Sequence, residues 1–361
     1  MADVPAPGRI LVMRVDRIGD VVLSTPVLEA LRKAFPHAFI AVMVRDASRD
    51  VVEGNPHVNE VILYEKEGRH RSFGGMLALA RRLRTYDFDT VVVLHPSDRA
   101  HLIARLARIP VRVGYARKSG WLLTHRVPHH KHEGKRHEAE YALEVLQVFG
   151  ITPAAVTMGV TPGTPVPFVP VHPDAAARVS ARLAQEGIAP ETALVVVHPS
   201  ASCPSKRWMP ERFADVADRL VRDHGVRVCL VAGQADAGFA AQTAAAMREP
   251  ALNLAGQLTV AELAALLARA RLLISNDSGP VHVAAGVGTP VVAIFGRNQP
   301  GVSQQRWRPL GAGHVVLQKD VGCVNCLAHL CDIGFLCLTS LSAEDVYLAA
   351  AGVLARPQPV N

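Results

Sequence analysis

The segment NDSGPVHVAAGVGTP, residues 276–290, gathers an acid, a hydroxyl, a glycine, a proline and a histidine where an alanine-rich helix begins. The apolar run RLLIS precedes it, so these residues follow directly after a strand. The first N–H groups of a helix lack partners within the helix, and the helix dipole adds partial positive charge. Gly279 permits close approach of a ligand to the main chain, and Pro280 suits the first turn. The segment is therefore a candidate anion site, suited to a diphosphate.

Two explanations are open for the other polar side chains of this segment. Ser278 can donate a hydrogen bond to a bound anion, and His282 follows close behind on the helix. Asp277 or Ser278 could instead cap the helix, which is a common structural role for both residue types. The pattern is compatible with capping and with ligand binding.

A second polar loop, HPSASCPSKRWMPERF at residues 198–213, follows the apolar run ALVVV. Ser200 and Ser202 supply hydroxyl donors for phosphate oxygens, and Lys206 supplies a point charge that would neutralise them. The alternative is a solvated loop in which Trp208 packs against its own helix. A phosphate site and a purely structural loop are both open here.

A third loop lies in RVDRIGDVVLSTP, residues 14–26. Gly19 permits a tight turn, and Asp20 stands at the start of the following helix. Asp20 could cap that helix, a role worth about 1 kcal/mol, or act as a general base that contributes about 10²–10⁴ in rate. The chain has no G-x-G-x-x-G after its first strand and no G-x-x-x-x-G-K-[ST], so dinucleotide and P-loop functions lose their main support.

The 361-residue chain has a formal charge of +7 and a sequence pI of about 9.3, which favours an anionic partner. Basic residues gather in segment 111–141, which would meet phosphates at a membrane surface or form a solvated charged loop. They are Arg112, Arg117, Lys118, Arg126, Lys131, Lys135 and Arg136. Aromatic residues make up only 5% and no nucleic-acid-binding motif is present, so no nucleic-acid partner is expected.

Four of the six cysteines cluster near the end of the chain, at Cys323, Cys326, Cys331 and Cys337. A Cys-x2-Cys pair followed by two more cysteines could bind zinc. The tight, irregular spacing and the apolar setting of Cys337 in GFLCL favour small buried residues or loosely paired thiols instead, so structural zinc is not expected. We predict a cytoplasmic protein, because the sequence contains neither a secretory signal nor 18 consecutive apolar residues.

Short apolar, β-branched runs alternate with helical segments along the whole chain, a rhythm typical of parallel sheets covered on both faces. Strands are expected at ILVMRV, FIAVMVR, VILY and TVVVLHP, and later at ALVVV, VRVCLVAG, RLLIS and TPVVAIFG. The proline-rich stretch 161–174 separates the two series and reads as a linker. We therefore predict an α/β protein with two domains, 1–160 and 175–340, in which ligands sit beyond the carboxyl ends of the strands. Segment 341–361 is expected to add a helix, capped at Ser342, and a tail that packs back on the first domain.

The three loops, in their order and spacing, resemble the ADP-heptose:lipopolysaccharide heptosyltransferases, glycosyltransferase family 9. The resemblance rests on ILVMRVDRIGDVVLSTPVLEALRKAFP, HPSASCPSKRWMPERFADVADRL and NDSGPVHVAAGVGTPVVAIFG, and it covers nearly the whole chain. It implies the GT-B fold, two Rossmann-like domains facing across a cleft. It also implies metal-independent, inverting transfer of heptose from ADP-heptose, bound by the second domain, to the phosphorylated inner core of lipopolysaccharide, bound by the first.

The resemblance further implies roles for individual residues. Asp20 would be the general base, and Lys206 would neutralise the diphosphate leaving group. The remaining donor contacts would come from Ser200, Ser202, Gln234, Leu258, Asp277, Ser278, Gly279, Pro280 and His282. Acceptor contacts would come from Arg17, Arg112, Arg117, Lys118 and Arg136, with the protein touching the inner membrane from the cytoplasm. Around Lys206 the chain departs from the family pattern, with Ser-Ala-Ser in place of adjacent threonines.

Two other functions are open on the same residues. The chain could keep this fold and mechanism but use a different nucleotide-sugar or acceptor, because the acceptor loops determine that choice. It could also be a non-catalytic protein that binds a nucleotide-sugar. Loss of Asp20 or Lys206 would have favoured the second of these, and both residues are present.

Overall fold

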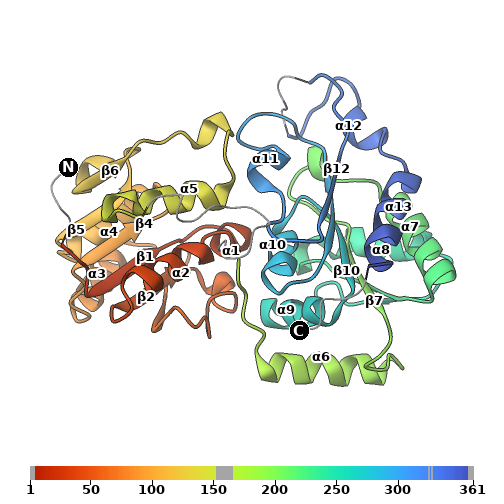
Figure 1. The fold of residues 1–361 in the computed structure, drawn as a ribbon, viewed down its shortest axis with the longest axis horizontal. Helices are drawn as coiled ribbons and strands as arrows, with labels where there is room; N and C mark the ends of the chain where they lie inside the picture. Colours follow the sequence, from red (N-terminus) through yellow and green to blue (C-terminus); the bar gives the residue numbers. More distant parts are fainter. Residues whose placement is uncertain (1–4, 152–165, 324–325, 327, 357–361) are drawn as a thin grey trace. The chain divides into compact units, whose positions relative to one another are not determined.

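The computed structural model describes residues 5–151, 166–323, 326 and 328–356, and it divides into two compact units, 1–170 and 171–361 (Figure 1). The division falls within the proline-rich stretch 161–174 that the sequence marks as a linker. Residues 161–165 of that stretch lie outside the described part. Each unit is an α/β structure built on its own six-stranded parallel sheet, as the alternation of strands and helices predicts.

Unit 1 has the strand order β3-β2-β1-β4-β5-β6, and all neighbouring strands pair in parallel. The strands are β1 (Arg9–Met13), β2 (Phe39–Val44), β3 (Glu60–Leu63), β4 (Thr90–Val93), β5 (Val111–Tyr115) and β6 (His125–Val127). The helices are α1 (Ile18–Val22), α2 (Thr25–Ala34), α3 (Phe73–Arg84), α4 (Asp98–Leu106) and α5 (Glu138–Glu144). The pair α3 and α4 and the pair α2 and α5 each pack together, so the sheet is covered on both faces.

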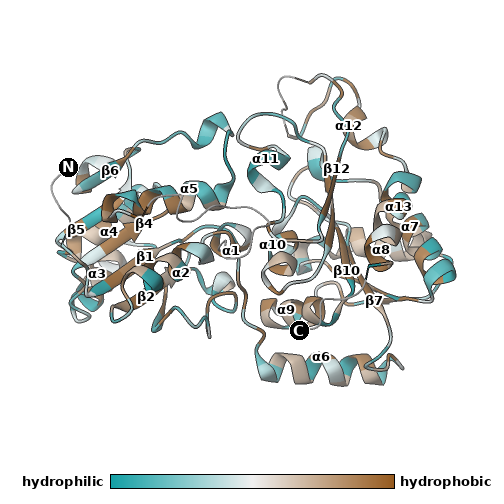
Figure 2. Ribbon diagram, viewed as in Figure 1, coloured by the Kyte–Doolittle hydropathy of each residue, from teal (hydrophilic) through white to brown (hydrophobic). Residues whose placement is uncertain are grey.

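Unit 2 repeats this plan with the strand order β12-β11-β10-β7-β8-β9. The strands are β7 (Leu194–His198), β8 (Arg227–Leu230), β9 (Ala251–Asn253), β10 (Leu272–Asn276), β11 (Val291–Phe295) and β12 (Val315–Gln318). The helices are α6 (Pro173–Gln185), α7 (Pro210–His224), α8 (Ala237–Ala246), α9 (Val260–Arg269), α10 (Gly279–Gly286), α11 (Gln304–Trp307), α12 (Leu336–Thr339) and α13 (Ala343–Leu354). The strands are strongly apolar in both units (Figure 2), because both faces of each sheet are buried.

The helix expected after the third polar loop is divided into two helices in the structure. Helix α1 ends at Val22, and α2 begins at Thr25 after Ser24. Pro26 explains the break, because it has no N–H to continue the ladder and its ring would clash with the carbonyl four residues earlier. The break leaves α1 as a short helix that carries Asp20 directly after β1.

The helix expected near the end of the chain is present as α13 (Ala343–Leu354). Ser342 and Asp345 form the predicted capping box at its start. Its buried face, which includes Val346, Ala350 and Val353, belongs to the hydrophobic core of unit 2 and packs with α7. The terminal helix is therefore part of the core of unit 2.

Each sheet reverses its strand order once. In unit 1 the reversal lies between β1 and β4, and in unit 2 it lies between β7 and β10. At such a point the connections leave toward opposite faces, so the carboxyl ends of the two strands stay uncovered and ligands bind there. Among the described residues, no helix has the length and apolarity needed to cross a bilayer.

Candidate active site

An ion pair stands at the point where strand order reverses in unit 2. Lys206 ends the short 3₁₀ helix Pro204–Lys206 after β7, and Asp277 follows β10. The Lys206 Nζ and Asp277 Oδ2 atoms are 2.6 Å apart, and their side chains are 18% and 6% exposed. Burial raises the pKa of Asp277, and the Lys206 ammonium opposes that rise. The two polar loops of unit 2, 198–213 and 276–290, therefore meet at one ammonium group.

The Lys206 loop is fixed by the residues on either side of it. Trp208 is 1% exposed, its backbone N–H donates to Asn276 Oδ1 at 3.0 Å, and its indole N–H donates to the Leu341 carbonyl. A Cβ at Gly296 would lie 2.4 Å from the Ser205 carbonyl oxygen, so only glycine lets β11 end against this loop. The loop is therefore largely buried and not solvated, although Trp208 does pack against Phe213 of α7, the helix that follows it.

His198, the last residue of β7, is the residue that sequence reasoning overlooked in unit 2. Its Nε2 lies 3.1 Å from Ser200 Oγ, and its Nδ1 lies 3.3 Å from Ser275 Oγ and 3.2 Å from Ser278 Oγ. Burial lowers the pKa of His198 to about 4, so the ring is neutral near pH 7 and can both accept and donate. His198 therefore links the polar residues after β7 to those after β10.

The start of α10 settles the capping question for the segment 276–282. Ser278 occupies the N-cap position, but its side chain makes no capping hydrogen bond. Its hydroxyl points to His198 and Ser275 instead, and Asp277 pairs with Lys206. Capping by either side chain is therefore wrong, and the first N–H groups of this eight-residue helix have no side-chain cap.

The other residues predicted to bind the donor differ in how exposed their side chains are. Ser202 is exposed, whereas Ser200 is 1% exposed with its hydroxyl directed to His198. Direct contact of Ser200 with a ligand is therefore not supported, because its oxygen faces inward. His282 is 3% exposed.

The remaining donor-side residues follow the carboxyl ends of neighbouring strands. Gln234 lies after β8 and is exposed, and its side chain covers Gly256, where a Cβ would lie 2.7 Å from the Gln234 amide oxygen. Leu258 lies after β9 and is half-buried. Because β10, β7, β8 and β9 are consecutive in the sheet, the structure brings these candidates to a single edge of unit 2: Ser202, Lys206, Gln234, Leu258, Asp277, Ser278, Gly279, Pro280 and His282.

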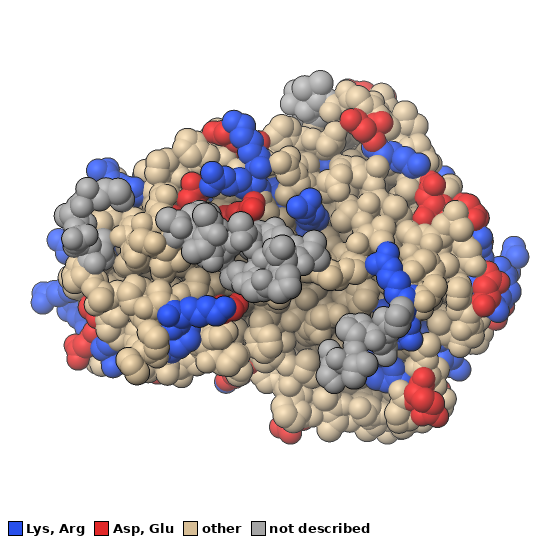
Figure 3. Space-filling view, in the orientation of Figure 1, with Lys and Arg blue, Asp and Glu red and all other residues tan. Residues whose placement is uncertain are grey.

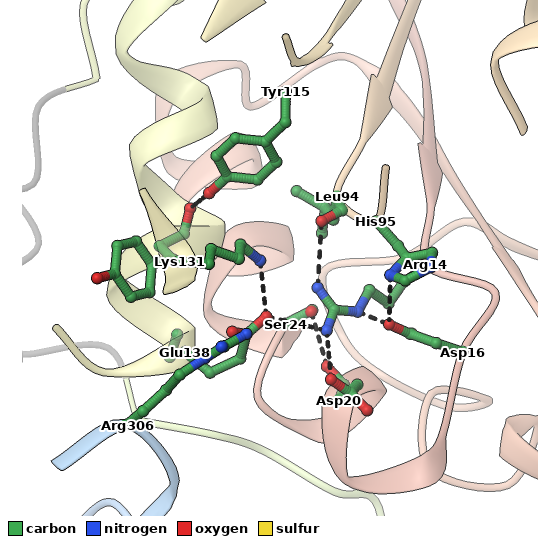
Figure 4. Close-up of polar contacts among 12 residues, drawn as sticks. Arg14, Asp16, Asp20, Ser24, Leu94, His95, Tyr115, Lys131, Glu138 and Arg306 are labelled. Atoms are coloured by element: carbon green, nitrogen blue, oxygen red, sulfur yellow. Dashed lines mark hydrogen bonds and ion pairs between the residues drawn. The ribbon is translucent and has the colours of Figure 1, made fainter. Parts of the chain in front are cut away.

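A buried arginine organises the corresponding edge of unit 1. Arg14, the first residue after β1, is 2% exposed and is bonded to three carboxylates (Figure 4). Its Nε lies 2.8 Å from Asp16 Oδ1, and its Nη2 lies 2.7 Å from Asp20 Oδ1 and 3.0 Å from Glu138 Oε1. Lys131 Nζ reaches the same Glu138 oxygen at 2.7 Å. The cluster thus contains three carboxylates and two permanent cations.

Strand β5 and helix α5 hold Lys131 and Glu138 of this cluster in place. The Tyr115 hydroxyl donates to the Tyr141 carbonyl of α5, and the Lys131 ammonium lies over the Tyr115 ring, 4.8 Å from its centroid. His137 caps α5 with Glu140 in a capping box, which places Glu138 in the first turn. Sequence reasoning missed Glu138, because 124 residues separate it from Arg14 and only the fold brings them together.

The pKa of Asp20 depends on burial and on the other charges of this cluster. Burial raises the pKa of Asp20, Arg14 opposes that rise, and the charges of Asp16 and Glu138 add to it. Burial also acts to raise the pKa of Asp16, but Arg14 and His95 together hold that pKa below its usual value. The N-cap of α1 is Arg17, so Asp20 is not the cap, and its side chain remains 19% exposed. Asp20 is accordingly a partly accessible carboxylate with enhanced basicity.

The basic residues predicted to contact an acceptor divide into two groups. Arg17, Arg117 and Lys118 are exposed on loops after β1 and β5. Arg112 donates instead to the carbonyls of Ile109, Pro110 and Leu122, and Arg136 is paired with Glu144 at 3.6 Å. On the face drawn in Figure 3, basic and acidic side chains are interspersed, without a continuous basic stripe.

The four clustered cysteines line a cavity of about 270 Å³ in unit 2, together with Ser205 and Gly296. All four thiols are free: Cys323, Cys326, Cys331 and Cys337. Among the described residues, no group of three or more His, Cys, Asp and Glu side chains is arranged to hold a metal ion. Ser205 donates its backbone N–H to the Ala328 carbonyl, so this segment packs under the Lys206 loop.

We expect Glu138→Gln to lower the free energy of unfolding by about 3 kcal/mol, because it leaves Arg14 and Lys131 buried without their shared anion. Urea denaturation measures this change. The matched control is Glu53→Gln, which breaks an exposed pair with Arg49 and should cost less than about 1 kcal/mol. Equal losses in the two variants would contradict the role of Glu138 in the cluster.

Comparison with known proteins agrees with this geometry. Residues 76–335 match the family model of glycosyltransferase family 9 (heptosyltransferase). Lipooligosaccharide heptosyltransferase 2 of Haemophilus ducreyi is 28% identical over 304 residues, which cover 81% of this chain and 84% of that protein. Lipopolysaccharide heptosyltransferase 3 of Escherichia coli K12 is 27% identical over 356 residues, with 94% and 96% covered.

Solved structures extend the likeness to the fold of both units. A family 9 glycosyl transferase from Veillonella parvula has a TM-score of 0.86 and 28% identity, and the match covers 96% of this chain and 97% of that one. The ADP-heptose lipopolysaccharide heptosyltransferase II of E. coli has a TM-score of 0.75 at 24% identity, covering 96% and 98%. Because the family model spans well over half of the sequence, this chain belongs to glycosyltransferase family 9, the heptosyltransferases, and is a glycosyltransferase of the GT-B fold.

Proposed function

We propose that this glycosyltransferase moves a heptose from ADP-heptose to the inner core of lipopolysaccharide, with inversion at the anomeric carbon and without a metal ion. The observation that carries the proposal is the placement of reactive groups at both points of strand-order reversal. Unit 1 has the basic carboxylate of Asp20 there, and unit 2 has the Lys206 ammonium beside the uncapped start of α10. The named relatives, which are lipopolysaccharide or lipooligosaccharide heptosyltransferases, support the choice of substrates.

In this proposal unit 2 binds the donor. The Lys206 ammonium and the first N–H groups of α10 bind the diphosphate, and they stabilise the negative charge that develops as the sugar–phosphate bond breaks. Asp277 orients Lys206 and accepts hydrogen bonds from sugar hydroxyls. Gln234 and Leu258, farther along the same sheet edge, flank the ribose and adenine. An ammonium and a helix terminus supply the positive charge that a metal would otherwise provide, which supports metal independence.

Unit 1 binds the acceptor and activates it. The acceptor hydroxyl forms a bond to the anomeric carbon while its proton passes to an Asp20 carboxylate oxygen, and ADP departs with the electrons of the broken bond. A single displacement of this kind inverts the anomeric configuration and needs only one carboxylate at the attacking oxygen. Arg14 holds Asp20 in position through its Nη2. We further propose that the exposed basic residues of unit 1 contact core phosphates, and that the reaction takes place on the cytoplasmic side of the inner membrane.

The direct test is transfer by the purified protein from a panel of nucleotide-sugars to a truncated, water-soluble core acceptor. We expect ADP-heptose to be the preferred donor, with full activity in EDTA and an inverted linkage by NMR. Asp20→Asn should lower the rate by about 10²–10⁴ while the affinity for ADP stays unchanged. Asp46→Asn, an exposed acid after β2, is the control. Normal turnover of Asp20→Asn would remove it as the base, and a strict divalent-ion requirement would contradict the mechanism.

Lys206→Met should weaken ADP binding by about 1.5–3 kcal/mol, because a charge-assisted contact to the diphosphate is lost, and transfer should slow with it. Isothermal titration calorimetry measures the affinity. Lys33→Met, whose lysine is 63% exposed, removes the same charge elsewhere and should leave ADP binding unchanged. Unaltered ADP affinity in Lys206→Met would overturn the leaving-group role.

Activity should fall on the acid side as Asp20 becomes protonated, at a pH above the usual range of an aspartate because its folded-state pKa is raised. The acid form cannot accept the acceptor proton, so kcat/KM decreases as pH falls through that pKa. Asp16→Asn removes one of the negative charges that raise the pKa of Asp20. It should therefore shift the acid limb of the pH–rate profile to lower pH. An unshifted profile would contradict the coupling within the cluster.

A further inference from the structure

Two aromatic side chains of unit 1 are far more exposed than is usual for their type. Phe73 is 63% exposed and Trp121 is 75% exposed, and they are the most exposed large hydrophobic side chains among the described residues of that unit. Phe73 begins α3, and Trp121 lies in the 3₁₀ helix Gly120–Leu122 after β5. Large apolar side chains that gather at one place on a surface mark sites that meet an apolar partner.

The first turn of α4 ties the loops that carry these aromatics together. The Arg99 guanidinium donates to the backbone carbonyls of His70 and Arg71, which hold the chain just before α3. The adjacent Asp98 accepts from the Ser119 backbone N–H at 2.9 Å and from its hydroxyl at 2.7 Å. Two neighbouring residues of a single helix thus fix both loops, so Phe73 and Trp121 flank the start of α4.

Uncommitted basic side chains surround the two aromatics. Arg71, Arg117 and Lys118 are exposed, and none of them forms an ion pair with any residue that the structure describes. The acids nearby are engaged: Asp98 accepts from Ser119, and Glu65 pairs with Arg69 at 2.5 Å. We refer to Arg71, Phe73, Arg117, Lys118 and Trp121 as the α4 surface. It combines apolar anchors with free positive charge.

We propose that the α4 surface docks on an anionic phospholipid bilayer, with Phe73 and Trp121 entering the headgroup region and Arg71 contacting lipid phosphates, beside Arg117 and Lys118, which contact phosphates of the lipid or of the core that it carries. Tryptophan and phenylalanine are suited to this interface, and each basic residue near an anionic leaflet adds to the attraction. The charge complementarity and the pairing of exposed aromatics with free cations favour a bilayer over a protein partner.

The position of this surface connects it to the reaction. Residues 117–121 follow β5 and residues 98–99 follow β4, so the α4 surface lies toward the carboxyl edge of the sheet that also carries Asp20. A bilayer bound there would bring a lipid-anchored acceptor to the edge where the proposed base lies. The inference rests on the proposed function only for the nature of that acceptor, because docking itself needs no substrate.

Sedimentation with vesicles tests the proposal. We expect the full chain to bind vesicles of phosphatidylcholine mixed with phosphatidylglycerol more tightly than vesicles of phosphatidylcholine alone. The double variant Phe73→Ser/Trp121→Ser should bind about tenfold more weakly, and Arg71→Gln about fivefold more weakly. The matched control is Leu330→Ser/Leu348→Ser, which removes exposed apolar side chains of unit 2 and should leave binding unchanged. Equal weakening in the control, or no preference for anionic vesicles, would overturn the proposal.

Fluorescence reports on the docking residue itself. The chain has three tryptophans, of which Trp208 is buried and Trp307 is half-buried, so Trp121 is the one exposed to water. In a Trp307→Phe variant, anionic vesicles should shift the emission to shorter wavelength, and Trp121→Ser in that background should abolish the shift. If Trp121 is instead covered by a second copy, the emission will already be blue-shifted without vesicles and sedimentation will show a dimer, which would overturn bilayer docking.

Transfer to the water-soluble acceptor separates this inference from the proposed function. The Phe73→Ser/Trp121→Ser variant should keep its rate on that acceptor, because neither side chain takes part in the chemistry. Loss of that rate together with vesicle binding would assign the residues to acceptor binding and overturn the docking role. If wild-type protein transfers heptose without binding vesicles, only the docking proposal is overturned. If it binds vesicles but transfers no heptose, only the proposed heptosyltransferase function is overturned.

Discussion

The reversal of strand order in each sheet is the constraint on which the site depends. A parallel sheet covered by helices on both faces leaves few places where backbone groups and side chains can meet a ligand. Where the connections diverge, at β1/β4 and at β7/β10, the carboxyl ends stay open. Asp20 and the Lys206–Asp277 pair stand at these two positions. The same topology used twice therefore positions the proposed proton acceptor in one unit and the proposed anion site in the other.

Buried charge gives the unit 1 site its chemical character. Arg14 has no access to water that could replace its carboxylate partners, so their number and spacing determine how readily Asp20 takes a proton. The Lys131 ammonium, 2.7 Å from the Glu138 carboxylate, neutralises part of the negative charge of Glu138. Asp20 is the most exposed of the three carboxylates, and the charges of Asp16 and Glu138 help to raise its pKa. Basicity and accessibility thus coincide at one side chain.

The sequence predicted the architecture well and the site in part. Long apolar runs such as those of β1, β7 and β10 identified two α/β halves, and the polar residues after them identified Asp20, Lys206 and Asp277. The strands β5, β6, β9 and β12 were missed: β6 and β9 have only three residues, β5 and β6 carry Arg112 and Arg126, and the apolar run of β12 is only three residues long. Glu138 and His198 were missed for a different reason. Their roles depend on partners distant in the chain, and periodicity does not reveal that the Ser200 hydroxyl faces His198.

The contact between Lys206 and Asp277 also bears on turnover. In the proposed mechanism the ammonium that binds the diphosphate has the Asp277 carboxylate 2.6 Å away. An incoming diphosphate would compete with that carboxylate, and the free energy of the displaced contact would be subtracted from its affinity. The same competition would favour release of ADP, because the protein supplies a replacement anion. An internal competitor of this kind would limit product inhibition.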